Sequence, residues 1–227
     1  MSKKKIVALA LSVAILAVVI VGASLAYLSD RTQVTTNTFT VGKVKIELDE
    51  HKVDATGKKT TETTKEGNTY NLLPGVTYDK DPFVTVKANS EDCYVRVKVT
   101  LDNADKIYKI YNDHNMTWTS AIAFFGGYDQ TVWIPESLTP PSGTETTCTV
   151  TFRYKEVVAK STSDQVLPEV IKTITLPSFV TGDDLASLPA TGFHATVIAE
   201  AIQAASFADA DAAWAAFDAQ MNPQTQP

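Results

Sequence analysis

The 227-residue chain is poor in the residues and spacings on which most catalytic and metal sites depend. It has two cysteines and three histidines, without the C-x-x-C spacing of zinc and thioredoxin-type sites or the H-E-x-x-H spacing of metallopeptidases. The G-x-S-x-G elbow of serine hydrolases, the Walker loop and the G-x-G-x-x-G loop are missing as well. We therefore expect no enzymatic activity, no metal site and no cofactor.

Basic residues are also few, with 20 Lys and Arg against 26 Asp and Glu and a net charge of −6. Surfaces that bind nucleic acids are usually basic, so we expect no nucleic-acid partner. The hydrophobic content of 44% is that of an ordinary globular chain. A chain of this length can bury one sizeable core or two small ones.

Three sets of residues have both a functional and a structural interpretation. The histidines have no second histidine at i+4, so we read them as exposed or turn residues: His51, His114 and His194. Four acidic residues would suit calcium but lack the EF-hand spacing, which favours a solvated acidic loop: Asp79, Asp81, Glu91 and Asp92. The tryptophans have apolar neighbours, which favours core positions over a carbohydrate-binding surface: Trp118, Trp133 and Trp214.

The N-terminus has the pattern of a secretory signal. Three lysines precede an uncharged apolar run over 6–28, and small residues occur at its end, as signal peptides require. We expect residues 1–26 to be removed, with Ser24 and Ala26 at the small positions and Tyr27 as the first residue of the mature chain. The alternative is a retained anchor, because the run is long enough to span a bilayer. On the first interpretation the protein is exported and meets the membrane only through this segment before cleavage.

Most of the remaining chain alternates between apolar and polar residues, which predicts half-buried strands. We expect strands within 37–50, 81–101, 119–127, 130–135, 146–158, 171–179 and 194–204. Short accessory helices are expected at 103–113, at 182–188 with Asp183 or Asp184 as its cap, and at 208–221 with Trp214, Phe217 and Met221 on one face. Since no βαβ rhythm occurs, the pattern predicts an all-β fold, an antiparallel β-sandwich. It does not separate a jelly roll from an immunoglobulin-like topology.

The expected organisation of the mature chain has four parts. An N-terminal strand segment over 27–50 is followed by an exposed loop or hairpin over 51–69, the sandwich with its C-terminal helix over 70–221, and a tail over 222–227. Cys93 and Cys148 each begin a predicted strand, and export would let them pair. That pairing depends on strand adjacency, because the two Cα atoms must lie within about 7 Å of each other.

The stretch LPATG over 188–192 has the form of a sortase signal. In such signals an apolar membrane span and a basic tail follow the pentapeptide, whereas 193–227 contains no lysine or arginine and no apolar run of about 20 residues. We therefore interpret LPATG as a turn in which Pro189 and Gly192 interrupt the chain.

One combination of motifs resembles a known family. Ala26, Tyr27 and Asp30 at the end of the signal precede NTFTVG over 37–42, and CYVRVKV over 93–99 and the Ala-rich segment near the C-terminus follow later. In this order they resemble the SipW-dependent TasA/camelysin (CalY) family of Gram-positive exported proteins. The resemblance implies cleavage by a SipW-type signal peptidase, a jelly-roll fold and, as in TasA, extracellular fibres.

Fibres of this family form by donor-strand exchange, in which an N-terminal strand of one subunit completes a sheet of the next by β-augmentation. The resemblance thus implies self-association into a homopolymer through inserting or packing side chains of 27–48: Phe39, Val41, Val44, Ile46 and Leu48. The alternative is that this segment pairs within its own chain. We expect a secreted structural protein of the biofilm matrix or cell surface. A camelysin-like metallopeptidase, which no metal-ligand motif supports, and a surface adhesin are the alternatives.

Overall fold

The structure is a computed structural model that describes residues 29–32, 44–116, 125–138, 141, 144–189 and 194–221. It is built mostly from antiparallel strands, with a few short helices, and so has the all-β character expected from the alternation. None of the helices in these ranges has the length and apolar character that crossing a bilayer requires.

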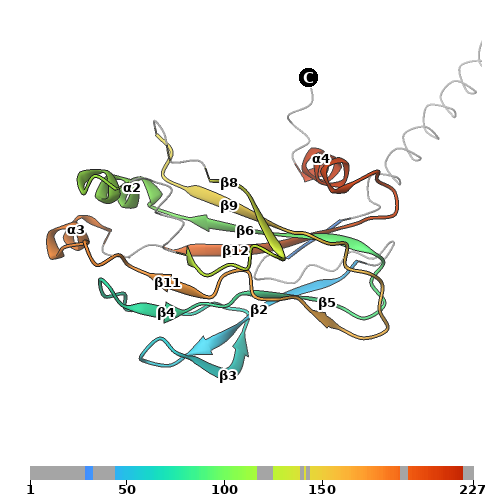
Figure 1. Ribbon diagram of the computed structural model, residues 1–227, viewed down its shortest axis with the longest axis horizontal. Coiled ribbons are helices and arrows are strands. Elements are labelled where there is room, and N and C mark those ends of the chain that lie inside the picture. Colours follow the sequence, from blue (N-terminus) through green and yellow to red (C-terminus); the bar gives the residue numbers. More distant parts are fainter. Residues whose placement is uncertain are drawn as a thin grey trace, which may run out of the picture.

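The described strands form three sheets, of which the largest has five strands in the order β1-β12-β6-β9-β8. Its strands are β1 (Ser29–Thr32), β12 (Ala195–Gln203), β6 (Cys93–Leu101), β9 (Cys148–Tyr154) and β8 (Trp133–Leu138), and each pairs antiparallel with its neighbours (Figure 1). The central strand β6 alternates as predicted, burying one face of apolar side chains: Cys93, Val95, Val97, Val99 and Leu101.

Two smaller sheets make up the opposite layer. The four-stranded sheet contains β10 (Gln165–Val166), β5 (Phe83–Val86), β2 (Ile46–Val53) and β3 (Lys59–Thr64), and the three-stranded sheet contains β4 (Thr77–Asp79), β11 (Thr173–Thr175) and β7 (Phe125–Gly126). In Figure 1, β2, β4, β5 and β11 run below β6, β9 and β12. A single core joins the layers, with members from both: Val97, Phe152, Ile46, Val84 and Ile174. Burial of these side chains is the main stabilising contribution to the fold.

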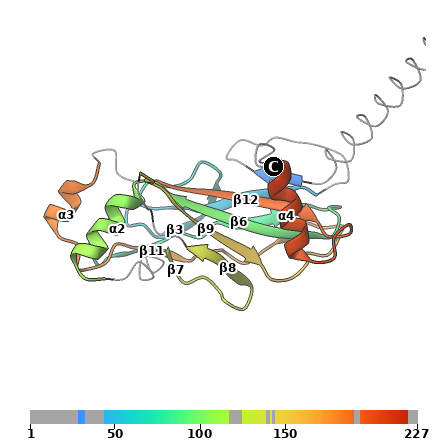
Figure 2. The same cartoon turned by 90° about the horizontal axis from the view of Figure 1, so that it is seen from above.

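A second, smaller core lies on the outer face of the five-stranded sheet. Helix α4 (Ala210–Met221) places Ala213, Trp214 and Phe217 against Ile202 of β12. In Figure 2 the helix lies across β6 and β12. The third residue of the predicted apolar face, Met221, is instead 37% exposed. It lies one turn beyond Phe217, at the last residue of the helix.

Helices α2 (Ala104–Asp113) and α3 (Gly182–Ser187) lie together at one end of the described part of the molecule (Figures 1 and 2). Helix α2 forms where it was expected. Helix α3 begins one residue earlier than Asp183, because Thr181 is its cap. The Thr181 hydroxyl accepts from the Asp184 backbone N–H at 3.2 Å, and the Asp184 carboxylate accepts from the Thr181 N–H at 2.7 Å. This reciprocal capping box corrects the expectation that Asp183 or Asp184 itself caps the helix.

The segment after β2 folds as an exposed hairpin with β3. Asp54 closes its turn by accepting from the backbone N–H groups of Thr56 at 2.8 Å and Lys58 at 3.0 Å. Gly57 has φ of 76°, and a Cβ at that position would lie 2.1 Å from a ring carbon of Tyr78. The turn therefore requires glycine, both for its conformation and for the close approach of the tyrosine ring.

Candidate functional site

One edge of the five-stranded sheet is formed by β1, and the other by β8. Strand β1 pairs with β12 over four residues, from Ser29 opposite Ile202 to Thr32 opposite Ala199. Strand β12 is nine residues long, and β6 pairs with its other side along its whole length. Among the described residues, no strand pairs with 195–198 on the β1 side. Because an open edge offers main-chain donors and acceptors to another strand, this edge is a candidate assembly site.

A row of charged residues crosses the sheet beside this edge. Arg31 of β1 is the register partner of Glu200, Glu200 that of Arg96 in β6, and Arg96 that of Arg153 in β9. The Glu200 side chain has no exposed surface. It accepts from the Arg96 Nε at 2.7 Å and lies 3.2 Å from the Lys98 Nζ. Hydrogen bonds and opposite charges of this kind are what a buried carboxylate requires.

Helix α4 contacts the members of this row that lie on β6 and β9, Arg96 and Arg153. The Arg96 guanidinium lies over the Trp214 ring, 4.3 Å from its centroid, and also bonds Asp218 at the end of the helix. Arg153 forms an ion pair with Asp211 at its start. Burial lowers the Arg96 pKa, but hydrogen bonds and charge from Asp218 and Glu200 outweigh that effect and raise it overall. Arg96 therefore stays charged and links the sheet to the helix.

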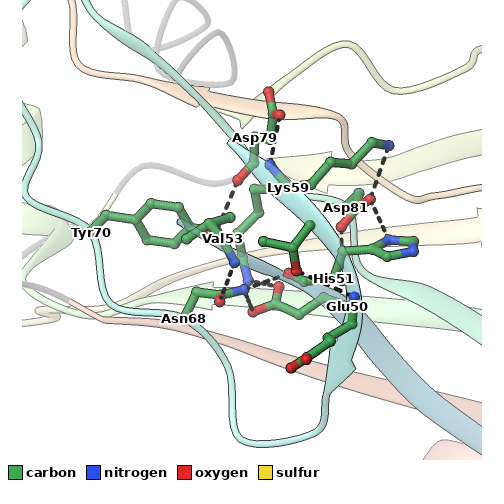
Figure 3. Close-up of polar contacts among 11 residues, drawn as sticks. Glu50, His51, Val53, Lys59, Asn68, Tyr70, Asp79 and Asp81 are labelled. Carbon is green, nitrogen blue, oxygen red and sulfur yellow. Dashed lines mark hydrogen bonds and ion pairs between the residues drawn. The ribbon is translucent and has the colours of Figure 1, made fainter. Parts of the chain in front are cut away.

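A second polar cluster lies under the β2–β3 hairpin (Figure 3). Glu50 and Lys80 form an ion pair that is more than nine-tenths buried. The Asn68 amide donates to the Glu50 Oε1 at 2.8 Å and to the His51 carbonyl at 2.9 Å, while its oxygen accepts from the Val53 N–H at 3.0 Å. These contacts satisfy the polar groups where the register of β2 shifts between His51 and Val53.

The same cluster contains a histidine held by a buried aspartate. The His51 Nδ1 lies 2.8 Å from Asp81 Oδ2, and Asp81 also accepts from the His51 N–H at 3.1 Å and the Lys59 Nζ at 3.2 Å. The hydrogen bond to Asp81 raises the Lys59 pKa. Burial raises the Tyr70 pKa, with the charges of Glu50 and Asp81 adding to it. Because the acids and cations of this cluster contact one another, its arrangement suits a structural role better than a catalytic one.

The expected donor-strand residues divide between two places. Val44 and Ile46 are buried in the main core, with exposed fractions of 7% and 1%, and Leu48 is half-buried against it. Strand β2 pairs with β5 of the same chain, with Ile46 opposite Val86. Phe39 and Val41 lie outside the described residues, as do the expected cleavage-site residues: Ser24, Ala26 and Tyr27.

The two cysteines do not pair. Both side chains are buried. Their strands β6 and β9 are adjacent, but Cys148 is the register partner of Leu101, at the opposite end of β6 from Cys93. Eight residues of strand separate the two positions, about 27 Å at 3.4 Å per residue, which is far beyond the Cα separation that a disulfide between them requires. Burial raises the thiol pKa of Cys93 to about 12 and of Cys148 to about 11, which makes both poor nucleophiles.

The expected acidic loop is two separate sites. Asp79 and Asp81 face Lys58 and Lys59 beside the hairpin, whereas the Glu91 carboxylate pairs with Lys160 and the Asp92 side chain accepts from the Lys160 backbone N–H. Across the described part of the chain, no group of three His, Cys, Asp or Glu side chains is arranged to hold a metal ion. Trp133 and Trp214 are buried, as the structural interpretation predicts, and Trp118 lies outside the described residues.

Sequence reasoning missed the charge row and the polar cluster. Their residues come from distant segments, as with Arg96 and Glu200, which are 104 positions apart. The sequence signal that could have found the charge row is a charged residue in the middle of an apolar strand, as with Arg96 and Glu200. Such a residue is rarely buried without a partner, so it indicates an opposite charge nearby.

Comparisons with protein-family models, curated proteins and solved structures find no match to the chain. The family resemblance drawn from the motifs therefore stays a prediction.

Proposed function

We propose that the chain is a secreted structural protein of the biofilm matrix or cell surface that assembles into fibres by donor-strand exchange. In this proposal a SipW-type signal peptidase releases the mature chain, and the two β layers form a jelly-roll-like sandwich. The signal-like N-terminus, the family-like motifs and the antiparallel architecture support it.

The observation that carries the proposal is the position of β1. This strand lies at one edge of its sheet, and its described residues pair with the neighbouring strand at four positions. The same four pairs would form if an identical strand of a second copy took its place, so exchange leaves the pairing energy almost unchanged. Polymer growth then depends mainly on protein concentration and on the entropic cost of association.

The donor in this proposal is β1 rather than β2. Removing β2 would take Ile46 from the main core and break its pairing with β5. Withdrawing β1 instead leaves the register between β12 and β6 intact along nine residues. The exchanging part of the expected segment is therefore its first few residues, ahead of Val44.

A cysteine trap tests this proposal. In the mature chain, Thr32→Cys with Ala199→Cys places two thiols at register partners. Under oxidising conditions a monomer forms the disulfide within one chain, whereas a strand-exchanged polymer links successive chains. We expect a ladder of covalent oligomers on non-reducing gels from samples that show fibres by negative-stain microscopy.

The matched control is Ser29→Cys with Ala199→Cys, in which the thiols are three register positions apart. We expect this pair to give little cross-linking in either state. If the mature protein stays monomeric at every concentration, or if fibres form while the trap stays within single chains, donor-strand exchange is wrong.

A further inference from the structure

Strand β1 lacks the feature that usually sets strand register. Register normally follows an apolar face, because a slip by one residue turns that face to solvent. The four residues Ser29–Thr32 read SDRT and contain no apolar side chain. Within this strand, charge is the property that distinguishes one register from the next.

Strand β12, which accepts β1, has one charged residue, Glu200, and it is buried. Glu200 is fully buried, while its neighbours along β12, Ala199 and Ala201, are alanines with no charge. In the observed register, Arg31 is the residue opposite Glu200. A slip of one residue in one direction would bring Asp30 opposite Glu200, and a slip in the other direction would bring the uncharged Thr32 there. Opposite charges in cross-strand positions stabilise a sheet and like charges destabilise it, so the two registers differ in energy.

We propose that Glu200 determines which strand the β12 edge accepts and in which register. It selects an extended segment with a basic residue opposite it and rejects one with an acidic residue there. The segment that fits is Ser29–Thr32 of a second copy of this chain, because the same sequence already occupies the edge in this register. The identity of that second copy rests on the proposed function, whereas the register rule applies equally to the strand of the same chain.

The other charged groups near Glu200 do not lie on the side from which β1 approaches. Arg96 approaches from β6 and is shared with Asp218 of α4, and Lys98 approaches from the same strand. These groups lie on the β6 and α4 sides of Glu200. The strand on its other side is β1, where Arg31 is its register partner.

A charge swap tests the rule without changing composition or net charge. Asp30→Arg with Arg31→Asp moves the basic residue by one position. The register should then shift so that position 30 faces Glu200 and position 29 faces Ala201. The trap Thr32→Cys/Ala199→Cys reports the original register, and Ser29→Cys/Ala201→Cys reports the shifted one.

In the parent sequence we expect the first trap to form faster than the second. In the swapped sequence we expect the order to reverse, with a change of about fivefold or more in the ratio of yields, given the usual strength of cross-strand charge pairs. Arg31→Lys should retain the original register. Arg31→Glu should slow the first trap about fivefold, while tryptophan fluorescence shows that the two cores remain folded.

The two proposals fail separately. The register rule is read from the disulfide within single chains, so it is testable in a monomer even if no fibre ever forms. An unchanged preference for the Thr32–Ala199 trap in the swapped sequence, or an Arg31→Glu variant that traps at the parent rate, would overturn the rule.

Discussion

Each of the three histidines contacts an aspartate that is far away in the sequence. The imidazole nitrogens lie 2.8 Å from Asp81 for His51, 2.9 Å from Asp184 for His114 and 2.9 Å from Asp102 for His194. The sequence predicted exposed or turn histidines, and it offered no sign of the partners, which are 30, 70 and 92 positions away. Each pair links two segments that are distant in the sequence, and the Asp184 pair attaches α3 to the end of α2.

Asp184 leads to a prediction about pH. The Thr181 backbone N–H, the Thr181 hydroxyl and then His114 stabilise its carboxylate and lower its pKa from 3.8 to about 2. A group whose pKa is lower in the folded state stabilises that state above its unfolded pKa. This contribution is therefore complete above about pH 4 and is lost as the pH falls through about 2.

The carboxyl carbon of Asp184, followed by NMR, should titrate with a midpoint near 2. In Thr181→Ala the midpoint should rise part of the way toward 3.8, since the capping hydroxyl is lost while the backbone N–H remains. Asp183→Asn, which removes the neighbouring acid of the same helix turn, is the control and should leave the Asp184 midpoint in place. A midpoint that is the same in Thr181→Ala as in the parent would contradict the capping box as the cause.

At the level of elements, a buried ion pair links β2 to a neighbouring segment, and a pair between buried Arg96 and half-exposed Asp218 links the five-stranded sheet to α4. Glu50 and Lys80 connect β2 to the segment between β4 and β5, and Arg96 connects β6 to α4. The Glu50–Lys80 pair is costly to break from one side, because the remaining group is then buried without its partner. Both pairs specify how the elements are joined more than they add to stability.

We expect Lys80→Met to destabilise the protein by about 3–5 kcal/mol, because Glu50 is then left buried without its partner. The double variant Glu50→Leu/Lys80→Met should recover most of that loss, since no charge is then left behind. Urea denaturation of the three proteins measures both changes in the free energy of unfolding.

An exposed pair in the same hairpin is the matched control. Lys52 and Glu62 lie 2.9 Å apart with side chains 52% and 71% exposed. We expect Lys52→Met to leave the free energy of unfolding unchanged within error, because water and salt screen such pairs. A double variant at Glu50 and Lys80 that is no more stable than Lys80→Met would show that apolar packing cannot replace the pair.

At the level of the whole molecule, β1 and β2 differ in how strongly each is held in the fold. Strand β1 contributes four edge pairs, whereas β2 contributes Ile46 to the main core and is bonded on both sides. This difference predicts distinct outcomes for two N-terminal truncations of the mature chain.

Removal of 27–32 should leave a folded monomer whose thermal unfolding is close to that of the parent. It should not polymerise alone, because it has an acceptor edge but no donor strand. Added in small amounts to assembling parent protein, it should shorten the fibres, since a growing end that binds it cannot extend. Removal of 27–48 should instead unfold the chain through loss of Val44 and Ile46.

Circular dichroism and electron microscopy distinguish these outcomes. Fibres of normal length from the 27–32 deletion alone would show that β1 is not the donor. A folded, stable product of the 27–48 deletion would show that β2 is dispensable to the core.

The sequence by itself determined the longer elements. Strands β6, β9 and β12 and helices α2 and α4 were predicted because their periodic apolar residues are a local signal spread over seven or more residues. The all-β character follows from the same signal. Strands β1, β4 and β10 were not predicted as such, because two to four residues are too short to show alternation.

Only the tertiary structure decided which residues meet. It separated Cys93 from Cys148 although their strands are neighbours, and it aligned Arg31, Glu200 and Arg96 in one row although they come from three distant segments. Strand order and register are long-range properties, set by packing two layers around a common core. Local alternation predicts which face of a strand is buried, but it does not predict which other strand will pair with it.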